Sequence, residues 1–208
     1  MPIIKSKKVS LIYEAILILI AIYGVFINTG LVPMAFLYYT TLSNILCMLY
    51  FADSIVRTLQ NKPVNHNLKG AVTLAITVTM LIYWGILAPH NFDVHTVNQL
   101  LGTLCVHLFV PLMTIFDWIL FDKKGQFSRW APLSWLAIPW VYYIVAVIGA
   151  SANLTFANGQ HYPYFFIDSN LLGWGPVLLI VLALTLFFLI FGYLFYFIDT
   201  KWGAKGHK

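Results

Sequence analysis

The chain has 208 residues, of which 61% are hydrophobic and only 9% are charged, and its mean hydropathy is +0.83. A soluble domain of this size needs far less apolar surface, and so few charges would not keep it dissolved, so the composition excludes a soluble globular protein. The formal net charge of +5 does not call for a nucleic acid, because lysines and arginines also suit loops beside anionic lipid.

Six apolar runs follow one another along the chain, separated by short polar patches. Each has about the 20 residues that a helix needs to cross a hydrocarbon core of about 30 Å. The runs do not alternate between apolar and polar residues as the strands of a membrane barrel do. We therefore predict an all-α polytopic membrane protein, a single domain with a bundle of six transmembrane helices. The predicted spans are residues 10–30, 34–58, 69–89, 97–121, 131–150 and 170–199.

The twelve lysines and arginines gather on one side of this arrangement. They precede the first span, follow the sixth, and lie in the connections between spans two and three and between spans four and five, where Lys69 counts as a loop charge. Because basic loops stay in the cytoplasm, we expect both termini to be cytoplasmic. Short outer loops without a domain of their own suggest a bacterial plasma membrane.

The first span and the two cysteines carry further expectations. The apolar part of the first span is longer than the 7–15 residues of a signal peptide and no A-x-A site follows it, so we expect a retained helix. Cys47 and Cys105 fall inside spans at different depths, so we expect no structural disulfide.

A polar stripe lies near the start of the second span, in the segment YYTTLSN at residues 38–44. Thr40, Ser43, Asn44 and Cys47 follow the i, i+3, i+4, i+7 spacing and share one helix face, whereas Thr41 points about 100° away. Counted from Met34 at 1.5 Å per residue, Thr40 lies roughly 9 Å below the outer surface.

The fourth span carries a similar stripe, whose members are Thr103, His107, Pro111, Thr114 and Trp118. Counted from Val97, His107 lies roughly 15 Å below the outer surface. Span boundaries are uncertain by about 2–4 residues, so the depths of Thr40 and His107 overlap and the two side chains can face each other. Pro111 is expected to kink the helix just below His107. A structural alternative stays open, since membrane threonines often bond their own i−4 carbonyl and asparagines join helices.

A second polar layer, at the cytoplasmic end, contains Glu14, Asp53 and Asp117. Arg57 follows Asp53 by one helical turn, so we predict an ion pair between them. The layer is either structural or the relay of a proton-coupled carrier.

In the outer loops, the segment HNFDVH does not match the ligand spacing of a metal site, so we predict no metal and no cofactor.

Four segments together resemble a known family: YYTTLSN in span two, HLFVPLMTIFDWILF in span four, RWAPLSWLAIPWVYY in span five and HYPYFFID before span six. In this order and spacing they are similar to the bacterial branch of the androgen-induced, androgen-dependent TFPI-regulating protein superfamily of six-span membrane proteins. Animal members of that superfamily are threonine hydrolases that cleave esters of fatty acids with hydroxy fatty acids. The resemblance implies that Thr40 is a catalytic nucleophile and His107 its partner base.

The chemistry implied is hydrolysis of a lipid-like fatty acyl ester that enters from the bilayer. A threonine hydroxyl attacks only when a base removes its proton, and a neutral imidazole within about 3 Å can do so. The oxyanion then formed needs hydrogen-bond donors, and a further group should hold the imidazole. We expect Asn44, Tyr38 or Tyr39 to serve as donors and Asp168 or Asn28 to hold the imidazole. We expect no nucleic acid and no protein partner.

The main alternative is the small-molecule binding subunit of a vitamin-type transporter. Such subunits also have six spans and are rich in aromatic residues near an outward-facing pocket. Trp84, Trp140, Trp174 and the HYPYFF segment offer aromatic rings on which a ligand could stack.

Overall fold

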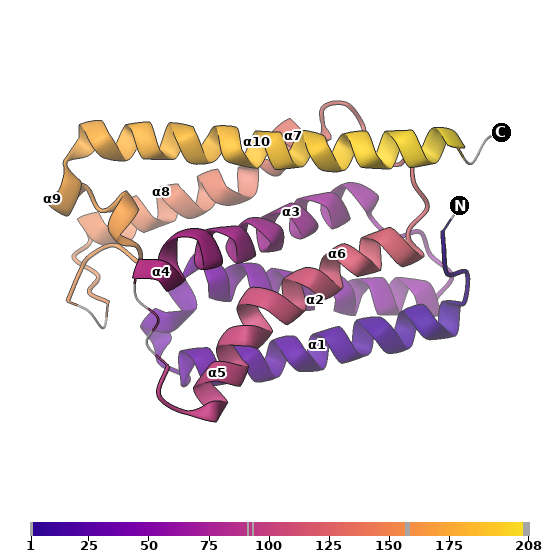
Figure 1. Ribbon diagram of the computed structural model, residues 1–208, viewed down its shortest axis with the longest axis horizontal. Helices are drawn as coiled ribbons and strands as arrows, with labels where there is room; N and C mark the ends of the chain where they lie inside the picture. Colours follow the sequence, from indigo (N-terminus) through magenta and orange to yellow (C-terminus); the bar gives the residue numbers. More distant parts are fainter. Residues whose placement is uncertain (1, 91, 93, 157–158, 206–208) are drawn as a thin grey trace.

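The computed structural model describes residues 2–90, 92, 94–156 and 159–205, which form an all-helical bundle (Figure 1). The helices are α1 (Lys7–Thr29), α2 (Tyr39–Leu59), α3 (His66–Ile82), α4 (Ala88–His90), α5 (Val97–Leu104), α6 (Val110–Phe121), α7 (Ala131–Trp135), α8 (Ala137–Ser151), α9 (Ser169–Leu172) and α10 (Trp174–Lys205). Short 3₁₀ turns cover Pro33–Leu37 and Phe165–Ile167.

Six segments within the described residues are long and apolar enough to cross a membrane, which confirms the predicted fold class. The segments are Lys7–Thr29, Tyr39–Leu59, His66–His90, Val97–Phe121, Ala131–Ser151 and Trp174–Gly203. The protein is therefore an integral multi-pass membrane protein. The two ends of the chain lie at the same end of the bundle, as an even number of spans requires (Figure 1).

The second and sixth spans begin later than the sequence predicts. Pro33 opens a 3₁₀ turn, Tyr38 is extended, and α2 begins only at Tyr39. Thr40 thus lies in the first turn of α2, and the assumption of a continuous α-helix from Met34, from which its depth was counted, is wrong. Gly173, with φ +78°, separates α9 from α10, so the last long helix begins at Trp174 rather than at residue 170.

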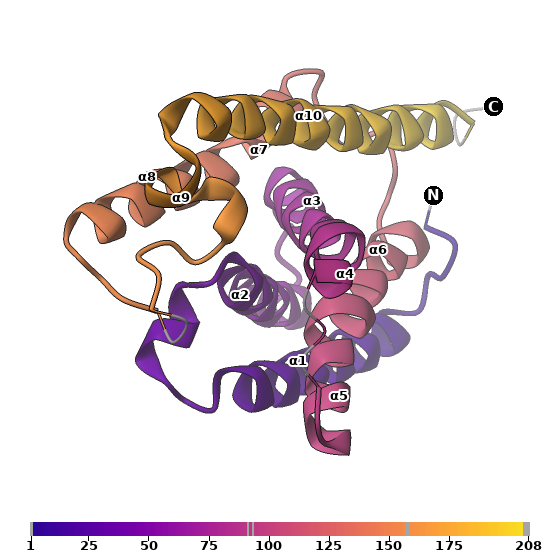
Figure 2. The same cartoon turned by 60° about the vertical axis from the view of Figure 1, so that its left-hand side comes forward.

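Four of the spans pack closely, and the other two flank them. In Figure 2, α1, α2, α3 and the α5–α6 segment surround a common centre, while α10, α8 and α9 lie to one side. The centre of the four-span group is filled by fully buried side chains, namely Leu17, Ala21, Cys47, Phe51, Val72, Ile76 and Val110. A second cluster, with Trp118, Phe127 and Trp135 in it, joins α6 and α7 to α10.

Two π-helical turns interrupt the third and fourth spans, at Tyr83–Leu87 and Cys105–Phe109. The second ends at Phe109, two residues before Pro111, where the sequence predicts a kink. The turns contact each other, because the indole N–H of Trp84 donates to the backbone carbonyl of His107 at 3.0 Å. Such turns often occur at functional sites, and here they surround the histidine that the sequence singled out.

Candidate functional site

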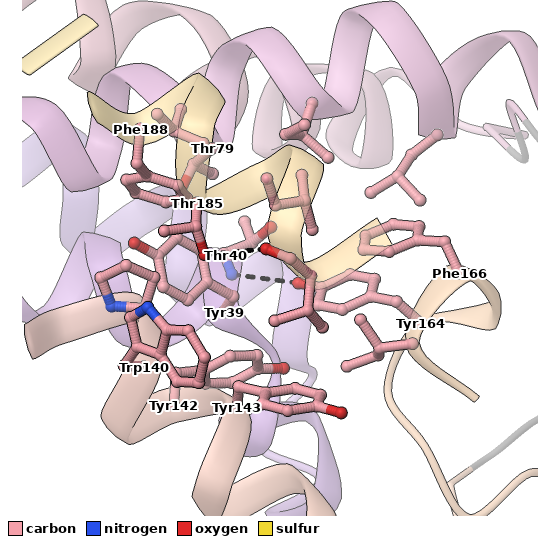
Figure 3. Close-up of a pocket in the computed structure, with 17 residues that line it drawn as sticks. Tyr39, Thr40, Thr79, Trp140, Tyr142, Tyr143, Tyr164, Phe166, Thr185 and Phe188 are labelled. Atoms are coloured by element: carbon pink, nitrogen blue, oxygen red, sulfur yellow. Dashed lines mark hydrogen bonds between the residues drawn. The ribbon is translucent and has the colours of Figure 1, made fainter. Parts of the chain in front are cut away.

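A cavity of about 100 Å³ lies where α2 and α3 meet α8, α10 and the segment before α9 (Figure 3). Its wall is almost entirely aromatic and aliphatic, with a few hydroxyl groups. The residues that line it are Tyr39, Thr40, Val78, Thr79, Ile82, Leu87, Pro139, Trp140, Tyr142, Tyr143, Tyr164, Phe166, Ile167, Val181, Leu184, Thr185 and Phe188. A site of this kind suits an apolar ligand that carries a small polar group.

Thr40 lines this cavity and contacts Tyr164, whose phenol points toward it (Figure 3). The backbone N–H of Thr40 donates to the phenolic oxygen at 3.2 Å, which satisfies one of the free donors at the start of α2. Burial raises the pKa of the Tyr164 phenol to about 12, although hydrogen bonds with Thr40 oppose the shift. The phenol is therefore neutral at physiological pH.

The hydroxyl of Thr40, a half-buried residue, differs from those of six other threonines in the helices. In these six the hydroxyl donates to the carbonyl of residue i−4, the structural role expected of a membrane threonine. This bond occurs at Thr29, Thr73, Thr77, Thr79, Thr114 and Thr185. No such bond is made by Thr40 in the described part of the chain. Its neighbour Thr41 donates to the carbonyl of Ala35 at 2.9 Å and is not on the cavity wall.

Asn44 connects the start of α2 to the π-helical turn of the fourth span. Its Nδ2 donates to the carbonyl of Thr40 at 2.8 Å and to that of Val106, the residue before His107, at 3.1 Å. Both amide hydrogens are thus occupied, so Asn44 has no free donor for an oxyanion. Its effect is instead to hold the backbones that carry Thr40 and His107 next to each other.

His107 is 5% exposed, and backbone groups fix its orientation. Its Nδ1 lies 3.1 Å from the carbonyl of Thr103. A carbonyl can only accept, so Nδ1 bears the hydrogen in the neutral ring and Nε2 keeps its lone pair, as a general base requires. The imidazole does not line the cavity, and no hydrogen bond joins it to Thr40 among residues 2–90 and 94–156.

The cavity wall carries several tyrosine hydroxyls without partners. The hydroxyl oxygens of Tyr39, Tyr142 and Tyr143 are buried and make no hydrogen bond within the described residues. Sequence reasoning selected Tyr39 but missed the other two, although both stand in the WVYY of the span-five segment. Tyr38 is not on the wall, and its ring packs edge-on against Tyr164 with centroids 5.6 Å apart.

The structure does not bring Asp168 or Asn28 to the imidazole. Asp168 caps α9, with Oδ1 accepting from the N–H groups of Asn170 and Leu171 at 2.8 and 3.2 Å. Asn28 donates to the carbonyl of Gly24 at 3.1 Å. In the described part of the chain, the hydrogen bond that holds His107 comes from the Thr103 carbonyl instead.

The charged layer at the opposite end of the bundle differs from its prediction in one respect. The pair between Arg57 and Asp53 is confirmed, with 2.5 Å between Nε and Oδ2. Lys69, however, is not a loop charge: it is 2% exposed inside α3 and forms an ion pair with Asp117. Tyr50 and Phe51 lie against its ammonium group, 5.4 and 4.9 Å from the ring centres.

Comparison of the chain with models of protein families, with curated proteins and with solved structures finds no match. The motifs quoted from the sequence and the geometry of the cavity are therefore the observations on which a functional proposal rests.

Proposed function

We propose that the protein is an intramembrane hydrolase that cleaves fatty acyl esters, with Thr40 as nucleophile and His107 as general base. The observation that carries this proposal is the position of Thr40 on the wall of an apolar cavity, with a hydroxyl that is not bonded to its own helix. An acyl chain of the bilayer suits the aliphatic and aromatic wall, which includes residues of the poorly buried α8 and α10.

The reaction has two steps. In the first, His107 Nε2 takes the proton of the Thr40 hydroxyl while the oxygen attacks the ester carbonyl, and the leaving alcohol then takes this proton as the acyl-threonine forms. In the second, water attacks the acyl-threonine, gives one proton to Nε2 and releases the fatty acid, and the proton returns to Thr40. The Asn44 bridge keeps the two backbones adjacent. No hydrogen bond joins the two side chains in the described part of the chain, and catalytic contacts often tighten only in the complex with substrate.

The oxyanion of each step requires donors that are free in the resting protein. The unpartnered hydroxyl of Tyr39, whose residue precedes Thr40, meets this requirement better than the occupied amide of Asn44. Tyr142 packs edge-on against Tyr39, with ring centroids 5.0 Å apart, and offers a second unpartnered hydroxyl. A buried donor of this kind contributes a large share of catalysis in acyl transfer.

Labelling by a fluorophosphonate probe, together with fatty acid release from a long-chain nitrophenyl ester, tests the proposal on the purified protein. Thr40→Ala should abolish labelling, and His107→Gln should lower the rate at least about a hundredfold. Thr41→Ala is the matched control, because its hydroxyl bonds the Ala35 carbonyl, and it should stay labelled. A probe adduct that persists in Thr40→Ala contradicts the assignment.

A second candidate function, the binding subunit of a transporter, is favoured by the aromatic rings of the same cavity. Trp140, Tyr142 and Tyr143 from α8 face Tyr164 and Phe166 across it (Figure 3). Trp84 and Trp174, also named in this interpretation, are not on the wall. A small aromatic compound that stays bound through purification, in a protein that the fluorophosphonate does not label, would favour this candidate over hydrolysis.

The basic residues favour an orientation with both termini in the cytoplasm, and the short outer loops favour a bacterial plasma membrane. A reporter enzyme active only outside the plasma membrane, fused after the last residue, should stay inactive. Activity of that reporter would reverse the orientation.

A further inference from the structure

A second cavity, of about 220 Å³, lies at the end of the bundle that carries both termini. Its wall is formed by the N-terminal segment and α1, the last turns of α2, the start of α3 and the end of α6. The N-terminal segment is fixed over it, since the N–H of Ile4 donates to the Leu120 carbonyl at 2.9 Å. A single water needs only about 10–15 Å³, so this cavity has room for a much larger polar ligand.

The floor of this cavity contains an acid with one unpartnered oxygen, as far as the described residues show. Glu14 is 4% exposed, and its Oε1 accepts from the hydroxyl of Ser54 at 3.0 Å. Its Oε2 is buried and has no hydrogen-bond partner within the described residues. Burying a carboxylate oxygen without a hydrogen bond costs folding free energy, and a donor that reaches the oxygen offsets this cost. The floor therefore suits a ligand group that donates hydrogen bonds, above all a primary ammonium.

The mouth of the cavity, unlike its acidic floor, is lined mainly by basic residues. Lys5, Lys7, Lys123 and His66 lie on its wall. The mouth also receives the N-terminal ends of two long helices, α1 and α3, and neither helix has an acidic residue in its first turn. Helix N-termini attract anions, and a phosphate at this position would meet both of them together with the lysines.

The acid lies deeper along α1 than the lysine at the start of the same helix. Glu14 follows Lys7 by seven residues of α1, which places it roughly 10 Å deeper along the helix. Ser10 lies one turn above Glu14 and also lines the cavity. The cavity wall contains two acids that could attract the ammonium groups of its lysines in place of a phosphate, Asp122 and Glu14. Asp122 already faces another lysine, Lys69, at 3.5 Å. The ammonium group of Lys7 also donates to the side chain of Asn61 at 2.8 Å, and this bond holds the Lys7 side chain at the mouth.

We propose that this cavity binds a phosphate ester that carries a primary ammonium group, with the ammonium on Glu14 and the phosphate among Lys5, Lys7, Lys123 and the two helix N-termini. This is the chemistry of a phosphoethanolamine group, supplied either by a lipid of the adjacent leaflet or by the free compound. The site is separate from the cavity at Thr40 and does not depend on the proposed hydrolase activity.

Native mass spectrometry of the full chain in a mild detergent, with three added phospholipids, tests this site. Phosphatidylethanolamine should be retained about tenfold more than phosphatidylcholine, whose nitrogen has no hydrogen, and than phosphatidylglycerol, which has no amine. Glu14→Gln should remove this preference. Asp53→Asn, an acid at the same end of the bundle that is paired with Arg57 and lies off the cavity wall, should retain it.

A second variant combines Lys7→Gln with Lys123→Gln and changes only exposed side chains. It tests the same site if Glu14→Gln fails to fold. It should weaken retention of phosphatidylethanolamine about tenfold. Free O-phosphoethanolamine distinguishes the sources: if it displaces the lipid the ligand comes from the soluble pool, and if it does not the ligand is the lipid headgroup. Equal retention of the three lipids by the unmodified protein overturns the proposal, as does unchanged preference in folded Glu14→Gln and the double lysine variant.

Discussion

The imidazole of His107 stacks on the ring of Tyr83, with ring centroids 3.4 Å apart and planes inclined by only 12°. The two rings come from the two π-helical turns, one in each of the third and fourth spans. Together with the Thr103 carbonyl, this stack determines which way Nε2 points. Tyr83 is therefore a positioning residue for the proposed base.

The stack gives a first prediction, on Tyr83→Leu. Aromatic stacking contributes about 0.5–1.5 kcal/mol beyond buried area, so losing it should lower ester hydrolysis roughly three- to tenfold. Tyr83→Phe keeps the ring and should stay within about twofold of the unmodified protein in the same assay. Equal rates for the Leu and Phe variants would show that the ring does not position His107.

A second prediction concerns the buried ion pair of Lys69 and Asp117. Lys69→Met leaves Asp117 charged and unpaired among apolar groups, and should lower the free energy of unfolding by about 3–5 kcal/mol. Adding Asp117→Leu removes the more deeply buried of the two carboxylates that Lys69 faces, Asp122 being the other, and should recover part of the loss. Equilibrium unfolding in detergent micelles measures both values.

The control for this pair is the exposed one at the same end of the bundle, Arg57 with Asp53. Arg57→Met should cost less than about 1 kcal/mol, because solvent screens an exposed pair. If Lys69→Met costs no more than Arg57→Met, the buried pair does not stabilise the bundle.

A third prediction follows from the close approach of α1 to the fourth span. A Cβ placed on Gly24 would lie 2.6 Å from the Cβ of Cys105 and 3.3 Å from the backbone nitrogen of Val106. Gly24→Val should therefore push the helices apart and lower the free energy of unfolding by about 1–3 kcal/mol. Gly175→Ala, in α10 with no atom near the new methyl group, should be neutral or stabilising by up to about 1 kcal/mol. Equal melting temperatures for the two variants would contradict this contact.

The fold was predictable from the sequence because lipid imposes a length and an apolar composition on every span. The lengths of the apolar runs gave all six segments, and the stripe from Thr103 to Trp118 is buried as its spacing predicted. The start of α2 was not predictable, since residues 34–37 are as apolar as a helix in lipid, although their backbone forms a 3₁₀ turn.

The candidate site was predictable only in part. Helical spacing put Thr40 and Asn44 on one face, but spacing does not reveal that the amide of Asn44 is already occupied. Lys69 was interpreted as a loop charge because its partner Asp117 lies 48 residues away in the sequence. The π-helical turns left no signal in the periodicity, and they determine where His107 points.

A final prediction concerns pH and Lys124, which lies in the connection between the fourth and fifth spans. Burial lowers the pKa of its ammonium to about 8, although Asp122 and Asp199 oppose the shift. The ammonium lies 4.5 Å from the ring centre of Trp118 and donates to that residue's carbonyl. Lysine in the unfolded chain keeps its proton up to its ordinary pKa of 10.5. Between these two values the unfolded chain binds more protons, so this lysine makes the folded protein more stable as the pH rises from 8 toward 10.5.

Lys124→Met removes this contribution, so its melting temperature relative to the unmodified protein should fall as the pH rises through that window. Below pH 8 the difference should not change with pH, since both states are then protonated. Lys123→Met, next in the chain but exposed, should follow the unmodified protein at every pH. Thermal melting of the three proteins at a series of pH values in one detergent measures this. A constant difference between Lys124→Met and the unmodified protein across the window would mean that Lys124 does not titrate there.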